Sequence, residues 1–230
     1  MAKGKVSPEL IEQFKQIVGE KYVYTDKDKL EPYSHDEVTD PHYMKEPQVV
    51  VLPATTEEVS KVVKLCYEND TVMVPRAAGT GLAAGAVATF GGVIISIERM
   101  NKILEIDKDN MVCVSEAGVT TSVLQDAVQK EGLFYGGDPC SGDSCFIGGN
   151  VATNAGGNRV IRYGNTREWI AGLKVVTGAG DVLEFNKALI KNSSGYDLRH
   201  LFIGSEGTLG VVVEATVRLT DPPPPTNVML

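Results

Sequence analysis

The sequence lacks the features that mark several large classes of protein. Its 22 lysines and arginines are outnumbered by 30 aspartates and glutamates, and they form no basic cluster. Nucleic-acid binding relies on basic patches that neutralise phosphates, so we expect no nucleic-acid partner. No apolar run approaches the roughly 20 residues that cross a bilayer, and the N-terminal residues lack the apolar segment of a secretory signal. We therefore expect a cytoplasmic protein without a membrane span.

The chain is also poor in metal ligands. Of its four cysteines, only Cys140 and Cys145 lie close together in sequence, whereas a zinc site usually needs two such pairs. Cys66 and Cys113 lie in apolar runs and are typical of small core residues. We expect no metal site and, in a reducing compartment, no disulfide.

The three histidines, His35, His42 and His200, are scattered along the chain. We interpret His35 as a surface or packing residue, because that is the commoner use of an isolated histidine. An acidic cluster follows it, and we expect this cluster to be a solvated face; its members are Asp36, Glu37 and Asp40.

Glycine, in contrast, is abundant, with 24 residues, and two segments are rich in it. Residues 75–82 read PRAAGTGL and follow an apolar run, and residues 147–157 read IGGNVATNAGG. Glycine permits positive φ and close approach of the backbone to a ligand, and successive amides in such turns form a concave nest for anions. Two such segments predict a large anionic ligand held from two sides, and a dinucleotide fits that description.

The hydrophobic pattern predicts an α+β fold with two lobes. Strand-like runs at 48–52 and 71–74 flank a helix at 55–69, which makes a βαβ unit with the first glycine segment at the end of its second strand. The remainder is mainly antiparallel with two helices, and Gly178–Asp181 marks a hairpin. Further helices are predicted at 8–19, 121–131 and 197–203, and further strands at 92–97, 103–106, 111–117, 173–177, 182–185 and 208–219.

Two common nucleotide-binding motifs do not fit. A Rossmann glycine loop opens into an amphipathic helix, whereas residues 83–92 contain three more glycines and no apolar stripe. A P-loop fails because no Gly-Lys-Ser/Thr follows either glycine segment.

The motifs instead resemble a known flavoprotein family. Residues 75–82, the segment 138–157, Arg162-Tyr163-Gly164 and the run LFIGSEGTLG at 201–210 resemble the vanillyl-alcohol-oxidase-type, or PCMH-type, FAD-binding domain. Their order is most similar to the branch that holds D-lactate dehydrogenase and the D-type subunit of glycolate oxidase. The resemblance extends from about Tyr33 to Leu219.

The resemblance implies FAD as cofactor and assigns residues to it. The first segment would wrap the pyrophosphate with main-chain N–H groups, the second would line the flavin, ribityl and phosphate path, and the third would close the adenine or ribityl side. Independently, Thr80, Ser144, Thr153 and Asn154 are short polar groups suited to hydroxyls and phosphate oxygens. The implied cofactor-binding residues are Pro75, Arg76, Ala77, Ala78, Gly79, Thr80, Gly81, Leu82, Asp138, Pro139, Ser144, Gly148, Gly149, Ala152, Thr153, Asn154, Glu206, Gly207, Gly210 and Val211.

Two positions depart from the family pattern. Relatives often carry Gly or Ser where Ala77 stands, so a positive φ there would be strained. Some relatives attach FAD through a loop histidine, and Thr80 occupies that place, which implies a noncovalent flavin.

The resemblance further implies oxidation of a D-2-hydroxy acid, such as D-lactate or glycolate, with hydride transfer to flavin N5. In this branch the base and a metal site come from a substrate-binding cap with a His-x-His-type motif, which this chain lacks. We therefore expect no assignable catalytic residue here. The expected organisation is an N-terminal helix and extension (1–46), an FAD-binding domain (47–219, with lobes at about 47–100 and 101–219) and a proline-rich linker or tail (220–230).

A missing cap domain or partner subunit would complete such an enzyme, with an electron-transfer flavoprotein or iron–sulfur subunit as a further partner. Other functions remain open at this point. One is a noncatalytic FAD-binding or electron-relay subunit of a larger flavoprotein complex. Others are a MurB-like reductase that uses the same fold and a purely structural domain.

Overall fold

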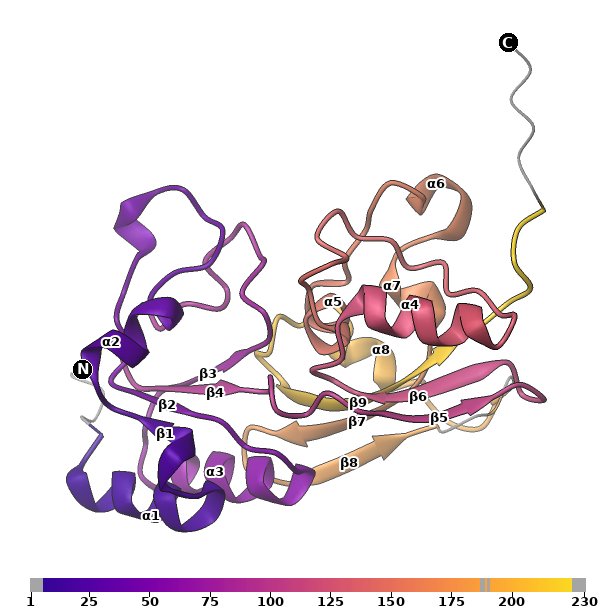
Figure 1. Cartoon of the computed structure of the whole chain (residues 1–230). Coiled ribbons are helices and arrows are strands. Elements are labelled where there is room, and N and C mark those ends of the chain that lie inside the picture. The colour runs from indigo at the N-terminus through magenta and orange to yellow at the C-terminus, as the bar shows by residue number, and fades with distance from the viewer. Residues whose placement is uncertain (1–5, 187–188, 190, 225–230) are drawn as a thin grey trace.

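The computed structural model describes residues 6–186, 189 and 191–224, and these residues form two β-sheets, one in each half of the molecule (Figure 1). The helices are α1 (Pro8–Val18), α2 (Lys27–Leu30), α3 (Thr56–Glu68), α4 (Thr121–Lys130), α5 (Ile147–Thr153), α6 (Val160–Tyr163), α7 (Thr166–Trp169) and α8 (Arg199–Phe202). The strands are β1 (Val23–Tyr24), β2 (Val49–Val51), β3 (Met73–Arg76), β4 (Val93–Ser96), β5 (Ile103–Asp107), β6 (Val112–Glu116), β7 (Ile170–Thr177), β8 (Val182–Phe185) and β9 (Gly210–Arg218). The predicted two-lobed α+β fold is confirmed.

The first lobe is built on a four-stranded sheet in the order β1-β2-β4-β3. Strands β2, β4 and β3 are parallel, and Ile94 in the middle strand pairs with Val50 on one side and Val74 on the other. The predicted βαβ unit β2-α3-β3 is present, with β4 inserted between its two strands. Such parallel strands are buried on both faces, which explains the uninterrupted run of valines in β2.

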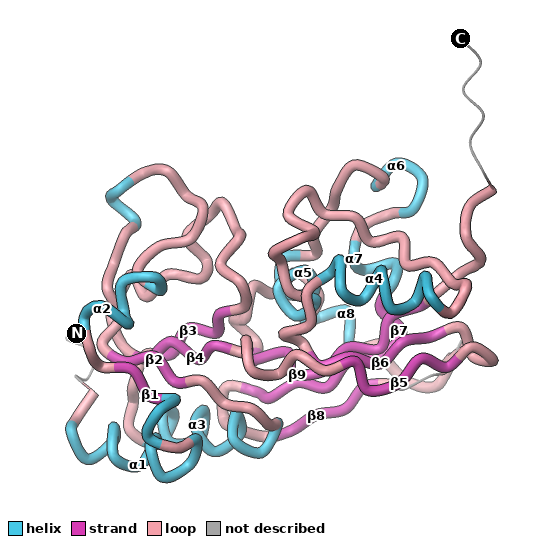
Figure 2. The backbone as a smooth tube through the Cα atoms, viewed as in Figure 1, coloured by secondary structure: helices cyan, strands magenta, loops and turns pink. Residues whose placement is uncertain are grey.

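Helix α3 begins directly after Thr55, the N-terminal capping residue. Thr55 Oγ1 accepts a hydrogen bond from Glu58 N at 3.2 Å, and Glu58 Oε2 accepts one from Ala54 N at 2.7 Å. Its apolar stripe is buried against the four-stranded sheet, as is that of α1. Figure 1 shows both helices on the same face of this sheet. Loops, rather than long helices, occupy the opposite face (Figure 2).

The second lobe contains a five-stranded antiparallel sheet in the order β5-β6-β9-β7-β8. The long, valine-rich β9 lies at its centre, paired with β6 on one side and β7 on the other. The predicted hairpin is confirmed, because β7 and β8 pair across the turn at 178–181. Helices α4 and α5 cover the face that points away from α3 (Figure 1).

One main hydrophobic core runs through both lobes. It joins Phe14 of α1, Val62 of α3, Val175 of β7 and Val151 of α5, all of which are buried. Ser60 Oγ, on α3, also donates a hydrogen bond of 2.6 Å to the carbonyl oxygen of Gly180 in the β7–β8 turn. The two lobes are therefore packed against each other rather than linked as separate bodies.

The structure differs from the sequence prediction in local detail. The second glycine segment, expected as a turn, forms helix α5, and residues 23–24 of the N-terminal extension add strand β1 to the first sheet. The predicted tail falls partly outside the described residues. Within the described part of the chain, no helix is long and apolar enough to cross a membrane.

Candidate cofactor site

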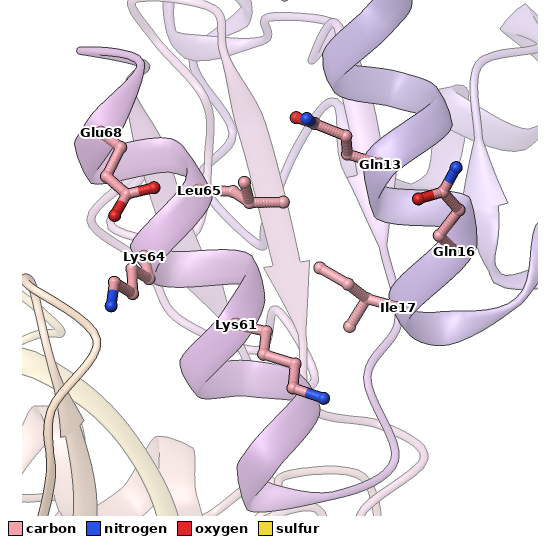
Figure 3. Close-up of a pocket in the computed structure, with 7 residues that line it drawn as sticks. All are labelled: Gln13, Gln16, Ile17, Lys61, Lys64, Leu65 and Glu68. Carbon is pink, nitrogen blue, oxygen red and sulfur yellow. The ribbon is translucent and has the colours of Figure 1, made fainter.

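A cavity of about 790 Å³ lies where the two lobes meet. The first lobe contributes the carboxyl end of β3 and the loop after it, and the second lobe contributes α5 and the start of β9. Its volume falls within the range of about 300–1,000 Å³ that is usual for small-molecule and cofactor sites. A second hollow, of about 380 Å³, lies between α1 and α3 and is lined mainly by polar and charged side chains (Figure 3).

The cavity brings together nearly all of the residues assigned to the cofactor. Segment 75–82, segment 139–153 and segment 206–211 all reach it, although they are far apart in sequence. All the assigned residues line the cavity except Asp138 and Asn154.

The two glycine-rich segments touch each other at the floor of the cavity. A Cβ atom placed on Gly149 would lie 3.0 Å from the Cβ of Ala77, and one placed on Gly148 would lie 2.6 Å from the Cβ of Ala117. The missing side chains therefore allow α5 to approach both the first loop and the sheet. Ala77 itself is not among the residues with positive φ, so the strain considered for that position does not arise.

The first loop is supported from below by the side chain of Arg76. Its Nη1 donates to Ala86 O at 3.0 Å and its Nη2 donates to Pro32 O at 3.2 Å. Gly79 has φ +73°, and a Cβ there would lie only 2.7 Å from the guanidinium carbon. Glycine is thus required at this position both for the turn and for the space.

Tyr33 and Glu98 complete the support behind this loop. Tyr33 Oη donates to Glu98 Oε2 at 3.0 Å, and Ser96 Oγ donates to the same oxygen at 3.0 Å. Burial, and next the charge of Glu98, raise the pKa of Tyr33 above its ordinary value of about 10, so the phenol remains a hydrogen-bond donor. The ring of Tyr33 also lies 5.5 Å from the guanidinium of Arg76.

The second segment is a helix rather than the expected anion nest. The amides of Ile147 and Gly148 donate to Val119 O at 2.9 Å and Ala117 O at 2.7 Å, so these two N–H groups are already used by the protein. Glycine disfavours helices, and α5 is held by these tertiary contacts instead. The segment therefore contributes to the cavity in two other ways: its backbone can approach a ligand closely, and side-chain hydroxyls line the wall.

Those hydroxyls are oriented by the backbone. Thr153 Oγ1 donates to Gly149 O at 3.0 Å, and Ser144 Oγ donates to Ser141 O at 3.2 Å. With their protons directed at carbonyls, the oxygens present lone pairs, which suit ligand hydroxyl or N–H donors better than phosphate oxygens.

The third segment closes the cavity from the second lobe. Glu206 adopts a left-handed conformation with φ 51°, and its amide donates to Ala152 O at 2.8 Å. A Cβ on the neighbouring Gly207 would lie 3.1 Å from Cγ of Pro75, so this loop packs directly on the end of β3. The loop thereby joins α5 to the first lobe.

Asn154 and Asp138 stand outside the cavity lining. Asn154 caps α5 in a left-handed conformation, and its Oδ1 accepts a hydrogen bond of 3.0 Å from Arg167 N. Asp138 forms an ion pair of 3.2 Å with Arg159. Both side chains hold neighbouring segments in place, and their assignment as cofactor ligands stays a prediction.

Asp36 is a lining residue that nothing in the sequence pattern selects. The expected solvated face is correct for Glu37 and Asp40, which are exposed, but wrong for Asp36, which is only 4% exposed. Its Oδ1 accepts from Val38 N at 2.9 Å, and its Oδ2 has no hydrogen-bond partner within the described part of the chain. Glu37 N donates to Gly81 O at 3.0 Å, and this bond draws Asp36 under the glycine loop; no periodicity in the sequence indicates such a contact.

The residues present fit a flavin dinucleotide. A glycine loop at the end of β3 suits phosphates, the hydroxyls of Ser144 and Thr153 suit sugar hydroxyls, and the apolar side chains of Ile97 and Phe146 suit a flat ring. Residues 47–186, more than half of the chain, match the family model described as "FAD binding domain".

The chain belongs to this family of FAD-binding domains. Its cofactor is FAD, as the family resemblance predicts, and FAD is a dinucleotide, as the glycine segments predict.

Curated relatives of this FAD-binding domain are enzymes named for 2-hydroxy acids. The chain is 52% identical over 206 residues to D-2-hydroxyglutarate dehydrogenase of Xanthomonas citri pv. viticola, covering 90% of this chain and 43% of the relative. It is 44% identical to D-lactate dehydrogenase of Anaerostipes hadrus (96% and 46% covered) and 43% identical to glycolate oxidase subunit GlcD of Bacillus subtilis (83% and 40% covered). The chain thus spans less than half the length of these relatives.

Solved structures agree on the fold. An alkyldihydroxyacetonephosphate synthase matches with a TM-score of 0.84 and 26% identity, covering 98% of this chain and 42% of the other. A p-cresol methylhydroxylase matches with a TM-score of 0.81 and 23% identity, covering 94% and 44%. The predicted resemblance to a PCMH-type domain is confirmed.

Proposed function

We propose that this chain is the FAD-binding portion of a flavin-dependent oxidoreductase that oxidises a D-2-hydroxy acid. The observation that carries the proposal is the convergence of three distant segments on one cavity at the junction of the lobes, in a member of the FAD-binding family. The names of relatives that are 43–52% identical support the substrate class, because they specify D-2-hydroxyglutarate, D-lactate and glycolate.

The chain's own residues would bind and orient the cofactor. The loop at 76–82 would hold the diphosphate with backbone N–H groups. Ser144 and Thr153 would accept hydrogen bonds from sugar hydroxyls, and Ile97 and Phe146 would exclude water from the ring. Bound FAD supplies the hydride acceptor for such an oxidation. Thr80 stands where some relatives carry the attachment histidine, which favours noncovalent binding.

We infer that the base that takes the substrate's hydroxyl proton would come from the part of the relatives that this chain does not span. His35 is half-buried beside Asp36, where its Nδ1 lies 3.2 Å from a carbonyl oxygen, and it is not among the cavity-lining residues. A cap domain or partner subunit would contribute the base and choose the substrate. The expected electron-transfer partner and the cytoplasmic location stay predictions.

The test begins with the purified chain reconstituted with FAD. We expect a flavin spectrum, and acid precipitation should release the flavin into the supernatant because it is not covalently bound. With a dye acceptor, the chain alone should oxidise D-2-hydroxyglutarate, D-lactate or glycolate only slowly. Failure to bind FAD would overturn the cofactor assignment, whereas rapid turnover by the isolated chain would overturn the need for a second half.

A further inference from the structure

The cavity presents an electrostatic problem for its proposed ligand. A dinucleotide brings negative charge at its diphosphate, yet the ionisable side chains that line the cavity include three carboxylates, those of Asp36, Glu37 and Glu206. Against them, Arg76 is the one guanidinium or ammonium group among the lining residues that the structure describes. Backbone amides can hold phosphates without net charge, but they must here work against the field of the acids.

Arg76 is held rigidly beneath the glycine loop. The residue is 7% exposed, and its two hydrogen bonds, to Ala86 O and Pro32 O, tie it to segments on either side of the loop. Its guanidinium lies so close under Gly79 that even a methyl group there would collide with it. The charge therefore has a fixed position behind the backbone that faces the proposed diphosphate.

The positive charge of Arg76 is not neutralised by a direct contact. Among the described residues, no carboxylate forms an ion pair with it. Asp36 and Glu98 act on it from a greater distance, and Glu98 already accepts hydrogen bonds from Tyr33 and Ser96. Burial lowers the pKa of Arg76, but a guanidinium stays charged at any physiological pH. A buried cation without a contacting anion has a field that solvent screens only weakly.

We propose that the side chain of Arg76 is a positioning residue for FAD that acts through the loop, by supplying the positive potential that draws the diphosphate onto the amides of residues 77–82. The guanidinium acts from behind the backbone and needs no contact with the ligand. This proposal deepens the proposed function and rests on it. It accounts for an arginine whose hydrogen bonds, within the described residues, go to carbonyls and whose charge no carboxylate contacts there.

The test compares Arg76→Gln, which keeps an amide donor without the charge, with Arg76→Lys, which keeps the charge. Arg99→Gln is the matched control, because Arg99 lies in the same lobe, donates to Leu52 O at 2.6 Å and stacks on Tyr22, away from the cavity lining. Flavin fluorescence gives the Kd for FAD and calorimetry gives the Kd for ADP, each at low and high salt. Thermal unfolding of each apo-variant reports whether it is folded.

We expect Arg76→Gln to weaken FAD and ADP binding by about 10- to 100-fold and to flatten the salt dependence of the Kd. Arg76→Lys should recover most of the loss, and Arg99→Gln should bind like the wild type. Wild-type affinity itself should fall as salt rises, a result that needs no variant to fold.

The proposal is overturned if Arg76→Gln binds within about twofold of the wild type, or if the lysine variant is as weak as the glutamine variant with an unchanged salt dependence. The latter pattern would mean a packing role alone. If the wild type itself binds no FAD, the cofactor assignment fails first, so the two failures are distinguishable.

Discussion

At the scale of single residues, glycine at 79 meets two demands at once. Its φ of +73° favours glycine, and the guanidinium of Arg76 occupies the space that a side chain would take. Gly132 has a similar φ of +78°, but a Cβ there would meet no neighbouring atom within 4 Å, so this position isolates the backbone effect.

We expect Gly132→Ala to lower the free energy of unfolding by about 1 kcal/mol and Gly79→Ala to lower it by about 2–3 kcal/mol. Gly79→Ala should also weaken FAD binding, because it displaces Arg76. Urea titration measures the free energy of unfolding of both variants, and flavin fluorescence measures the affinity of Gly79→Ala for FAD. Equal losses at the two positions would show that the collision with Arg76 is unimportant.

The surroundings of His200 disfavour the protonated form of its ring. Arg167 Nη1 donates to its Nδ1 at 3.0 Å, while its Nε2 lies 3.3 Å from Asp197 Oδ2. Burial lowers its pKa despite the opposing effect of Asp197, and the charges of Arg199, Arg167 and Arg218 add to the lowering. A protonated Nδ1 could no longer accept from Arg167.

A lowered pKa means that the folded state disfavours the proton, so the stabilisation is present above the ordinary pKa of about 6.5 and is lost as pH falls through the lower folded value. Between pH 7.5 and pH 5.5, the Tm of the wild type should fall more than that of His200→Gln. The exposed His42→Gln serves as control and should follow the wild type. Parallel curves for all three proteins would refute the assignment.

At the scale of elements, α5 shows how tertiary contacts override local preference. Its sequence begins Ile-Gly-Gly, and two glycines in a seven-residue helix argue against a helix from sequence alone. The helix exists because Gly148 lets it rest on Ala117 and Ile97, contacts that belong to a distant part of the chain. The longer α3 is predicted closely from its capping pair and apolar stripe, because both signals are local.

Gly148→Ala should therefore destabilise the fold, although alanine is the better helix former. The added methyl would lie 2.6 Å from the Cβ of Ala117 and 2.9 Å from Ile97 Cδ1, and we expect a net loss of about 1–3 kcal/mol from this overpacking. Gly178→Ala, in open space at the hairpin turn, should stay within about 0.5 kcal/mol of the wild type. Chemical denaturation of both variants decides the matter, and a neutral Gly148→Ala would contradict it.

For the strands too, the local sequence predicts that a strand forms, but the order of the strands in the sheet depends on tertiary contacts. Runs of valine and isoleucine predict β2, β4 and β9, because β-branched residues suit buried sheet positions. Strand order does not follow from them: β4 lies between β2 and β3 only once the chain has folded back. The two-residue β1 is too short to leave a pattern and is defined by its pairing with Val50 and Val51.

At the scale of the whole molecule, the site is a product of the tertiary fold. The glycine segments and the motif at 201–210 could be selected from the sequence, and the structure brings them to one cavity. Asp36 could not be selected from the sequence. Only its position beneath Gly81 distinguishes it from the exposed acidic residues beside it.

Because the cavity is lined by both lobes, we expect FAD to stabilise the entire fold. At a free concentration about 100 times the Kd, binding adds about 2.7 kcal/mol, which corresponds to a rise in Tm of about 5–10 °C for a chain of this size. Thermal unfolding with and without FAD measures the shift, and riboflavin, which has no diphosphate, serves as the comparison. An unchanged Tm at saturating FAD would contradict this expectation.

The core that α3 shares with β7, and the bond from Ser60 to Gly180, have a consequence for cofactor exchange. Two lobes that share a buried core cannot open about a hinge without exposing buried valines to water. We therefore expect FAD to enter and leave through movement of surface loops while the lobes keep their relative position. Apo and loaded forms should accordingly share one rigid frame, and hydrogen exchange on loading should slow in the loops at 77–92 and 204–209 while the shared strands stay as protected as before.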